Sequence, residues 1–436
     1  MGNKKVLNLG NAAACLITVA LIVLGLRIHY RIVRRPDSWV KNTAFFKEKN
    51  GFDVLFFGSS HMLNAVFPMQ LWHDYGIASY NMGEHVEFLP AAYEALQVSL
   101  SFFTPSVVVI DCYCVRQDDC KAFVNNVGYA HQLYDAFPLN LTKIKAIMTM
   151  NEKPYRAELL FPYSLYHNRW KEFDFARGWN ILFNDKISSF EYGSEYRVGV
   201  APIPDDAQLH FVQSESPLPK ESAGMGYMKK IIELCREKGI QSVFVYIPPL
   251  TNEDMQREDN SARILCNEYA VPYISFLYRS TVDCDVDLFN YDSINSHLNP
   301  SGARKVTDCL GKLLQESYHV PDRRNDSNYA SWYDDYEAYR TYLFNIMRSQ
   351  QNLKVSLMLC NNSNYTAELS VKEGVHFDRV EKKLVAQLGS SITVRTIPVS
   401  SQEVKHDVSL TIYDSITGSV IAEKHWDWQA GFVFEG

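Results

Sequence analysis

The sequence lacks several features that would point to well-known classes of protein. It has no internal repeat and no low-complexity segment, and 50 Asp and Glu residues outnumber 43 Lys and Arg residues, giving a net charge of −7. Basic residues form no stripe on any soluble segment, so a nucleic-acid-binding protein is not expected. With 47% hydrophobic and 21% charged residues, the 436-residue chain is globular rather than disordered.

Nine cysteines are present, but their spacing gives no metal-binding or disulfide pattern. Cys112, Cys114 and Cys120 are clustered without C-x-x-C spacing and without an accompanying His pair, so no zinc or redox site is expected there. The others are scattered, and those on apolar helix faces, such as Cys309, are interpreted as buried free thiols. The sequence therefore predicts neither a metal nor a cofactor.

One long hydrophobic run lies near the amino terminus. From Val6 to Leu26 the sequence contains no charged residue, and a helix of that length, at about 1.5 Å per residue, crosses a hydrocarbon layer about 30 Å thick. We interpret the run as a membrane anchor. One alternative is a cleaved signal peptide, although no small-x-small site precedes Arg27. The other is a buried helix, because Asn8 and Asn11 dilute its first turns.

The body of the chain alternates short apolar runs with helical periods, which is typical of a doubly wound, mostly parallel α/β sheet. Expected strands are residues 54–57, a second strand before Asn81, and residues 107–110, 242–247 and 272–276. Expected helices are residues 88–103, 226–238 and 252–269 and a last helix opened by Pro300.

Two polar segments stand out against this background. The strand 54–57 runs into Gly58-Ser59-Ser60-His61, so Ser60 lies beyond the carboxyl end of a strand, where open α/β sheets bind ligands. Far downstream, Asp292 and His297 lie in an Asn-rich loop ahead of the last helix. A Gly-Ser-Ser turn alone is a common loop, but together the two segments have the residue types of a Ser-His-Asp triad.

These segments resemble spaced blocks of a known family. The Gly58–His61 turn, Asn81-Met82-Gly83 after the second strand, and Asp292…His297-Leu298-Asn299…Gly302 look like blocks of the SGNH (GDSL-type) hydrolase superfamily. The chain looks closest to membrane-anchored bacterial relatives of the alginate acetylation and teichoic-acid D-alanylation proteins. The resemblance covers roughly residues 52–314 and implies a flavodoxin-like three-layer fold.

The resemblance also implies roles for individual residues. Ser60 would be the nucleophile, His297 the general base and Asp292 the residue that orients it. The backbone N–H groups of Ser60 and Gly83 would be oxyanion donors.

Two departures from the family pattern affect these roles. The family usually places its Asp three residues before the His, where this chain has Ile294, so the loop would have to bulge to bring Asp292 to the ring. The third strand runs into residues 111–116, which contain no Asn for the oxyanion hole. That donor is either missing or supplied from elsewhere, and losing one typically costs roughly 100- to 1000-fold in rate.

Several other residues are candidates for the pocket. His167 or Arg169, in a polar and aromatic cluster after the third strand, could reach back over the site; the alternative is that Arg169 pairs with a carboxylate while Trp170 packs. His61 is expected to line the pocket because neighbouring side chains on a turn diverge. The remaining candidates are Asp111, Arg116 and Asn299.

The sequence predicts three parts. Residues 1–36 form the anchor and juxtamembrane segment, and residues 37–320 form the SGNH-like domain with a helical lid inserted at about 115–221. The charged, turn-rich residues 319–328 mark a boundary. Residues 329–436 are expected to form a small α+β domain, with helices at 333–347 and near 377–388, a strand at 353–359 and a hairpin of residues 408–413 and 419–426. Whether Trp426 and Trp428 form a sugar-stacking surface is open.

The expected activity is serine-dependent acyl ester chemistry on a cell-envelope polysaccharide, either O-acetyl transfer or ester hydrolysis. Expected partners are an acylated glycan, a membrane acyl-donor protein and the bilayer. Arg27, Arg31, Arg34 and Arg35 follow the anchor, and the positive-inside rule would keep the body cytoplasmic; the family resemblance favours the outside, and we side with it. The alternative function is a catalytically inactive, glycan-binding or envelope-assembly protein of the same fold.

Overall fold

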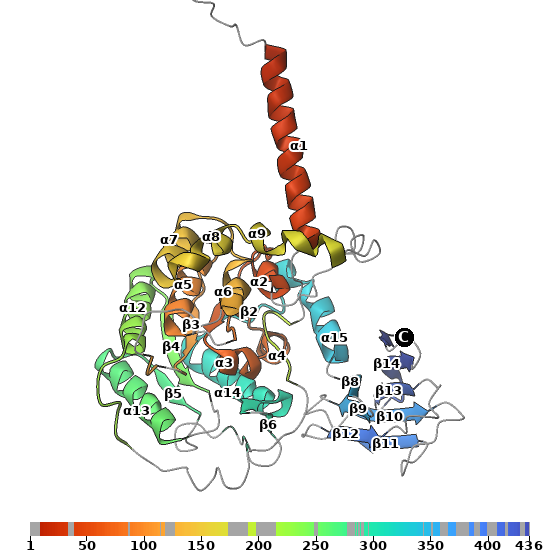
Figure 1. Cartoon of the computed structure of the whole chain (residues 1–436). Coiled ribbons are helices and arrows are strands. Elements are labelled where there is room, and N and C mark those ends of the chain that lie inside the picture. The colour runs from red at the N-terminus through yellow and green to blue at the C-terminus, as the bar shows by residue number, and fades with distance from the viewer. Residues whose placement is uncertain are drawn as a thin grey trace, which may run out of the picture.

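The fold is seen in a computed structural model (Figure 1), which describes the following residues. They are 9–33, 39–85, 88–113, 115–117, 127–172, 191–197, 215–247, 252–276, 284, 286, 288, 292–294, 296–342, 344–349, 352–357, 365–371, 383–387, 393–398, 408–414, 417–427 and 432–435.

A five-stranded parallel sheet forms the centre of the molecule, in the order β2-β1-β3-β4-β5. Its strands are β1 (Val54–Phe57), β2 (Ser79–Asn81), β3 (Val107–Asp111), β4 (Gln241–Tyr246) and β5 (Tyr273–Ser275). The chain leaves β1 for one edge of the sheet and returns to β3 on the other side, so the strand order reverses between β1 and β3. Ligands of such sheets bind at this switch point.

Helices cover both faces of the sheet, which gives three layers (Figure 1). On one face α14 (Pro300–Tyr318) packs on α3 (Ser60–Ala65) and α4 (Pro68–Tyr75). On the other face α12 (Ala223–Lys238) packs between α5 (Leu89–Ser99) and α13 (Glu253–Glu268). The predicted doubly wound α/β fold is confirmed.

The sheet core explains why the strands were visible in the sequence. Every residue of β1 and β3 is buried, as expected of strands covered on both faces, which are apolar along their whole length rather than alternating. Helix ends follow local rules: Gly239 ends α12 with φ of 69°, and Asn140 caps α7 (Leu141–Met150).

Helix α1 (Leu9–Val33) extends away from the body (Figure 1). Residues 13–33 are long and apolar enough to cross a membrane, so this helix is of the kind that serves as an anchor or a signal sequence. The first residues of the predicted run, 6–8, lie outside the described residues. Helix α2 (Trp39–Phe45) follows and packs beside α6 (Val127–Tyr134).

The predicted insertion is helical in its described parts. It contains α6, α7, α8 (Lys153–Leu160), α9 (Tyr163–Tyr166) and the 3-10 helix η1 (His167–Glu172). Helices α9 and η1 contact the end of α1, and α7 contacts α5. Only the short segment 191–197 of the described insertion reaches the end of β1, as the next subsection details.

The C-terminal part contains more strands than predicted. Strands β8 (Phe344–Ser349), β9 (Asn352–Leu357) and β12 (Thr393–Pro398) form one antiparallel sheet. A second sheet has the order β11-β10-β13-β14-β15. Its strands are β10 (Tyr365–Val371), β11 (Lys383–Gln387), β13 (Val408–Asp414), β14 (Val420–Asp427) and β15 (Phe432–Glu435).

Two helix predictions in this part were wrong, while the hairpin prediction was right. The helix expected at 333–347 ends with α15 (Trp332–Tyr342), and the helix expected near 377–388 is strand β11 where it is described. In both places pairing with a neighbouring strand overrides a weak local helical pattern. Strands β13 and β14 pair antiparallel as expected. Trp428 and the side chain of Trp426 lie outside the described residues.

Helix α15 is attached to the α/β body although it follows the predicted boundary. The Trp332 ring lies 5.1 Å from that of Trp72 on α4 and 4.2 Å from that of Tyr192, and Trp332 is fully buried. Just before it, Arg323 makes two hydrogen bonds to the Asp53 carboxylate, at 2.7 and 2.9 Å. The division at 319–328 stays a prediction.

One cysteine prediction was also wrong. Cys309 is joined to Cys284 by a disulfide, whereas Cys112, Cys235 and Cys266 are buried free thiols as expected. Spacing alone could not reveal the bond, because it depends on how the loop before the last helix folds back onto that helix.

Removal of the Trp332 side chain should destabilise the whole body. Trp332→Ala is expected to lower the free energy of unfolding by about 3–5 kcal/mol, since it leaves a cavity among packed rings. The measurement is denaturant unfolding of the detergent-solubilised chain, with the exposed Asp334→Ala as control. Equal stability of the two variants would show that α15 does not belong to the core.

Candidate functional site

The turn after β1 is shaped by close contact with the end of β3. Gly58 has φ of 148°, and a Cβ there would lie 2.6 Å from the Asp111 Cβ, so only glycine fits. Ser59 caps α3 by accepting a hydrogen bond from the His61 N–H at 3.2 Å, and its hydroxyl donates to Asp111 Oδ2 at 3.1 Å. Ser60 is therefore the first residue of α3, partly exposed at the switch point.

The structure brings Ser60 and His297 together. Ser60 Oγ lies 2.8 Å from His297 Nε2, across 237 positions of sequence. His297 is held by a short hairpin of β6 (Ser293–Ile294) and β7 (His297–Leu298), directly before α14. A nucleophile and a base are thus within hydrogen-bond reach.

The hairpin corrects the expectation of a bulged loop. Ile294 pairs with His297, and Ser296 turns the chain with φ of 63°. Asp292 is two residues before Ile294, so it lies on the same face as His297 but diagonal to it. Its carboxylate is fully buried and accepts a hydrogen bond from Lys305 Nζ on α14 at 2.8 Å.

Arg197, which the sequence gave no reason to choose, contacts the other side of the His297 ring. Its Nη1 lies 3.3 Å from His297 Nδ1. A guanidinium has only donors, so Nδ1 must accept, and a neutral ring then carries its proton on Nε2 and donates it to Ser60 Oγ. A base that accepts the serine proton needs the opposite tautomer, with Nε2 free.

The segment 191–197 holds Arg197 in place. The Asn81 N–H donates to Tyr192 O at 2.9 Å, and the Glu195 N–H donates to Leu63 O at 3.1 Å. At Gly193, with φ of 89°, a Cβ would lie 2.0 Å from Asn81 O. The segment is therefore pinned between the end of β2 and α3.

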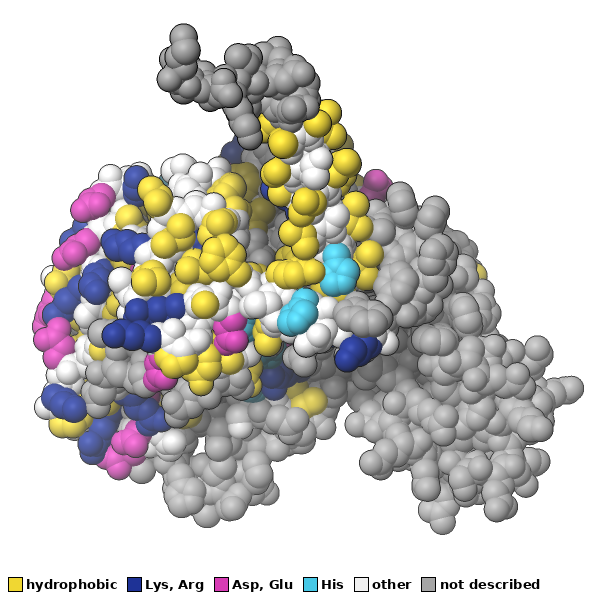
Figure 2. All heavy atoms as spheres, turned by 45° about the horizontal axis from the view of Figure 1, so that its top comes forward, with side chains coloured by type: hydrophobic (Ala, Val, Ile, Leu, Met, Phe, Trp, Pro, Cys, Tyr) yellow, Lys and Arg dark blue, Asp and Glu magenta, His cyan; other side chains and the backbone are white. Residues whose placement is uncertain are grey.

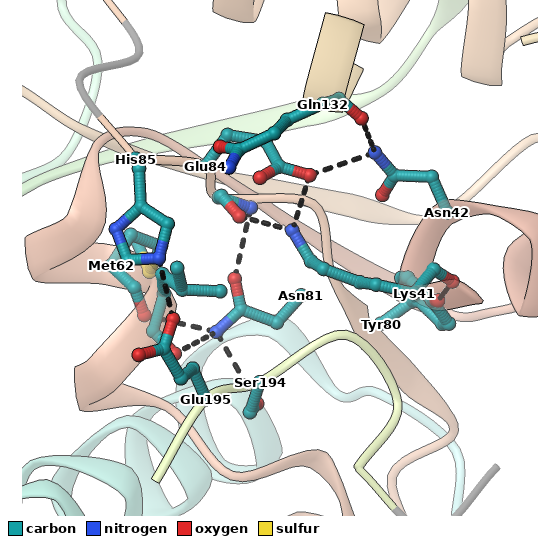
Figure 3. Close-up of polar contacts among 12 residues, drawn as sticks. Lys41, Asn42, Met62, Tyr80, Asn81, Glu84, His85, Gln132, Ser194 and Glu195 are labelled. Atoms are coloured by element: carbon teal, nitrogen blue, oxygen red, sulfur yellow. Dashed lines mark hydrogen bonds and ion pairs between the residues drawn. The ribbon is translucent and has the colours of Figure 1, made fainter. Parts of the chain in front are cut away.

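Asn81 connects three parts of the site (Figure 3). Its Nδ2 donates to Met62 O at 2.9 Å and to Val66 O at 3.1 Å, and its Oδ1 accepts from the Gly83 N–H at 3.0 Å. The Gly83 N–H, expected to be an oxyanion donor, is thus engaged within its own turn. A Cβ at Gly83 would lie 2.9 Å from Leu63 N, so glycine is needed here for close packing.

Ion pairs surround this turn (Figure 3). His85 Nε2 lies 2.6 Å from Glu195 Oε2, and Lys41 Nζ lies 3.0 Å from Glu84 Oε1. Arg197 Nε lies 3.8 Å from Glu195 Oε1. Burial opposes ionisation of Glu195, but His85, Arg197 and Lys41 together hold the pKa of its carboxyl below the ordinary value. Glu195 therefore stays charged and holds Arg197 beside His297.

His61 lies against His297 rather than facing an opening. The two rings are stacked with centroids 4.7 Å apart, and His61 is 4% exposed. On its other side the ring of Tyr113 lies at 4.1 Å. Burial, together with the charges of His297 and Arg197, holds the pKa of His61 well below its usual range, so His61 is neutral.

The other predicted pocket residues have contacts away from Ser60 Oγ. Asn299 Oδ1 accepts from the Gly302 N–H at 3.3 Å and so caps α14. Arg116 Nε lies 2.9 Å from Glu258 on α13. His167 contacts Ser164 O at 2.7 Å, and Arg169 donates to Val33 O at 3.1 Å, at the base of α1. The side chain of Trp170 lies outside the described residues.

Asp111, at the end of β3, lies behind the nucleophile turn. Its Oδ1 accepts from the N–H groups of Tyr113 and Ile247, at 3.2 and 3.3 Å. Burial raises the pKa of Asp111 to about 7 against the opposing effect of these bonds. Within the described ranges, no group of three or more His, Cys, Asp or Glu side chains is arranged to hold a metal ion.

Asp111 should make stability depend on pH. Its pKa is higher in the folded state than the unfolded value of about 3.9, so the protonated carboxyl stabilises the fold at low pH and this stabilisation is lost as the pH rises through 7. Asp111→Asn keeps an acceptor at Oδ1 but cannot ionise. Between pH 5 and 8 the wild type should lose on the order of 2–3 kcal/mol more than this variant.

Denaturant unfolding at several pH values measures this difference, and the exposed Asp334→Asn is the control. Identical pH slopes for wild type and Asp111→Asn would contradict the assignment.

Comparisons with known proteins give no name to this chain. No family model matches it, and no curated protein matches it. Eleven solved chains are similar, among them a Bacteroides fragilis protein provisionally named an acylhydrolase. That likeness has 9% identity and a TM-score of 0.31, covering 65% of this chain and 99% of the other.

Proposed function

We propose that the protein carries out serine-dependent acyl ester chemistry through Ser60. The observation that carries this proposal is the 2.8 Å contact between Ser60 Oγ and His297 Nε2. It lies at the switch point of a doubly wound sheet, where such folds bind ligands. It also joins two segments that the sequence singled out independently.

The reaction proceeds by covalent catalysis. His297 takes the Ser60 proton while Oγ forms a bond to the acyl carbonyl carbon; the ester C–O bond then breaks, and His297 gives the proton to the leaving alkoxide. Water or a sugar hydroxyl next attacks the acyl-enzyme, losing its proton to His297, and Ser60 leaves with that proton. Water as acceptor makes an esterase, and a glycan hydroxyl makes an O-acyltransferase.

The described arrangement is a resting state of this machinery. For His297 to act as a base, its proton must move from Nε2 to Nδ1, which requires Arg197 to withdraw from Nδ1. Asp292, on the same face of the hairpin, is the carboxylate available to receive the Nδ1–H, in exchange for its bond to Lys305. Arg197 is then a positioning residue that sets the tautomer of the base.

Oxyanion stabilisation is the weak part of the site. The Ser60 N–H, at the start of α3, is one donor, whereas the Gly83 N–H is engaged by Asn81. Asp111 stands where the family supplies an Asn, and it is buried behind Ser59. A slow enzyme follows, since each lost donor typically costs roughly 100- to 1000-fold.

The substrate we favour is a cell-envelope polysaccharide, with O-acetyl transfer or ester hydrolysis at a sugar hydroxyl. The membrane-spanning character of α1 and the resemblance to envelope-modifying proteins support this choice. On this proposal the body is extracytoplasmic, and a membrane protein supplies the acyl group.

A second candidate is a non-catalytic glycan-binding or envelope-assembly protein. The observation that favours it is the Arg197 contact on Nδ1, which gives His297 the wrong tautomer for a base. The two candidates differ in whether Ser60 ever becomes acylated.

Ser60 should react with an active-site serine probe. Incubation of the detergent-solubilised chain with a fluorophosphonate should label the wild type at Ser60, and Ser60→Ala should abolish labelling, because the probe reports an activated hydroxyl. Ser59→Ala is the matched control; it removes a helix cap worth about 1 kcal/mol but should keep the label. Equal labelling of wild type and Ser60→Ala would leave the non-catalytic candidate.

Removal of Arg197 should speed the reaction with a small neutral ester. A hydrogen bond to a charged group contributes about 1.5 kcal/mol at its low end, so Arg197→Ala is expected to raise 4-nitrophenyl acetate hydrolysis about tenfold by freeing Nδ1. Arg116→Ala, which removes a guanidinium paired with α13, is the control. A fall in rate for Arg197→Ala would show that this cation assists catalysis instead.

A further inference from the structure

Large apolar side chains gather on one exposed surface of the insertion. Outside α1, ten large apolar side chains of the described residues are exposed, and seven of them lie between positions 139 and 165. We call these seven the apolar patch: Leu139, Leu141, Ile144, Met148, Tyr155, Phe161 and Leu165. Figure 2 shows apolar side chains over this face of the body, next to the helix that projects from it. Such gathering is unusual for a surface that faces water.

Helix α7 is apolar on two opposite sides. Ala146 and Ile147 are buried in the body, whereas Leu141, Ile144 and Met148, spaced at helical intervals, are 85%, 37% and 46% exposed. A helix that only covered a core would carry polar residues on this outer side. The outer side therefore has the composition of a second buried surface.

The patch is fixed relative to α1 by contacts at the helix end. The His29 ring lies 5.6 Å from that of Tyr163, and the Tyr30 ring lies 6.4 Å from that of Tyr166. Arg169 donates to Val33 O, the last residue of α1, at 3.1 Å. Helices α9 and η1, which continue from the patch, are therefore joined to the last turns of α1.

The length of α1 gives the level of the patch relative to a bilayer. Arg27 is the first charged residue after the apolar run, and six residues separate it from Val33. At about 1.5 Å per residue this is roughly 9 Å, close to the thickness of one headgroup layer, about 5–8 Å. If α1 spans, α9 and η1 lie at the headgroup level.

The charged residues of the patch suit the same location. Lys145 and Lys153 are exposed among the apolar side chains, together with Glu152. Lysines beside apolar residues and tyrosines are typical of segments at a membrane interface, where the ammonium groups reach the headgroups.

We propose that the apolar patch rests in the headgroup and acyl-chain boundary of the same bilayer that α1 crosses. The ligand is a phospholipid surface, and the body is held against it by α1 and the patch together rather than tethered at a distance. This inference depends on α1 spanning the membrane and is independent of the chemistry at Ser60.

Photo-crosslinking of the full chain tests the proposal. The photoreactive p-benzoylphenylalanine replaces Leu141 or Phe161 in the patch, or Asn267 on α13 as exposed control, and Leu16 in α1 serves as positive control. Each protein is reconstituted at one copy per phospholipid nanodisc and irradiated. Mass spectrometry should find lipid adducts at positions 16, 141 and 161 and none above background at 267.

Several outcomes would overturn the proposal. Lipid adducts at Leu16 without adducts at Leu141 and Phe161 would mean that the patch does not touch lipid. Absence of adducts at Leu16 would mean that α1 does not span. In native membranes, adducts of positions 141 and 161 to another protein or to a second copy, in place of lipid, would assign the patch to that partner.

Discussion

The site depends on the carboxamide of one buried residue, Asn81. Its amide group donates to carbonyls at both ends of α3, and its oxygen accepts from the Gly83 N–H, while its backbone N–H holds Tyr192 of the segment 191–197. Buried backbone groups need such partners, because an unmet one costs about 1–3 kcal/mol. Three segments distant in sequence are thereby fixed around the first turn of α3. Ser60 has a defined position because this network leaves α3 no freedom to shift.

The same network sets the polarity of the His297 ring. Glu195 is held to Leu63 through its backbone and to His85 through its carboxylate, and it keeps the Arg197 guanidinium near Nδ1. On the opposite side Lys305 occupies the Asp292 carboxylate. The acid that would orient the ring and the cation that now does so are thus each held by an opposite charge. Exchange of partners between these pairs reverses the tautomer without any change in the fold.

The fold could be predicted because its signals are local. Continuous apolar runs such as residues 54–57 and 107–110 and capped helices declared the sheet, and Ser60 and His297 followed from their positions at element ends. Arg197 and the engaged Gly83 N–H could not be found this way, because they depend on a segment that enters from the insertion without a helix or strand of its own. Asp292 was chosen correctly as a carboxylate on the face of His297, but its bond to Lys305 needed the packing of α14. The helix expected near 377–388 failed for a related reason: strand pairing is decided by a distant partner.

The insertion links the membrane-facing surface to the site, and its two ends move differently. Its helices α9 and η1 are joined to α1, whereas residues 191–197 are pinned by Asn81, Leu63 and the close contact at Gly193. Because a Cβ-sized shift is not tolerated at Gly193, the backbone of this segment cannot withdraw to release His297. The release must therefore occur by rotation of the Arg197 side chain about its own bonds, which takes no more than nanoseconds for partly exposed groups. What limits exchange of the ring tautomer is then the charge on Glu195, not motion of the insertion.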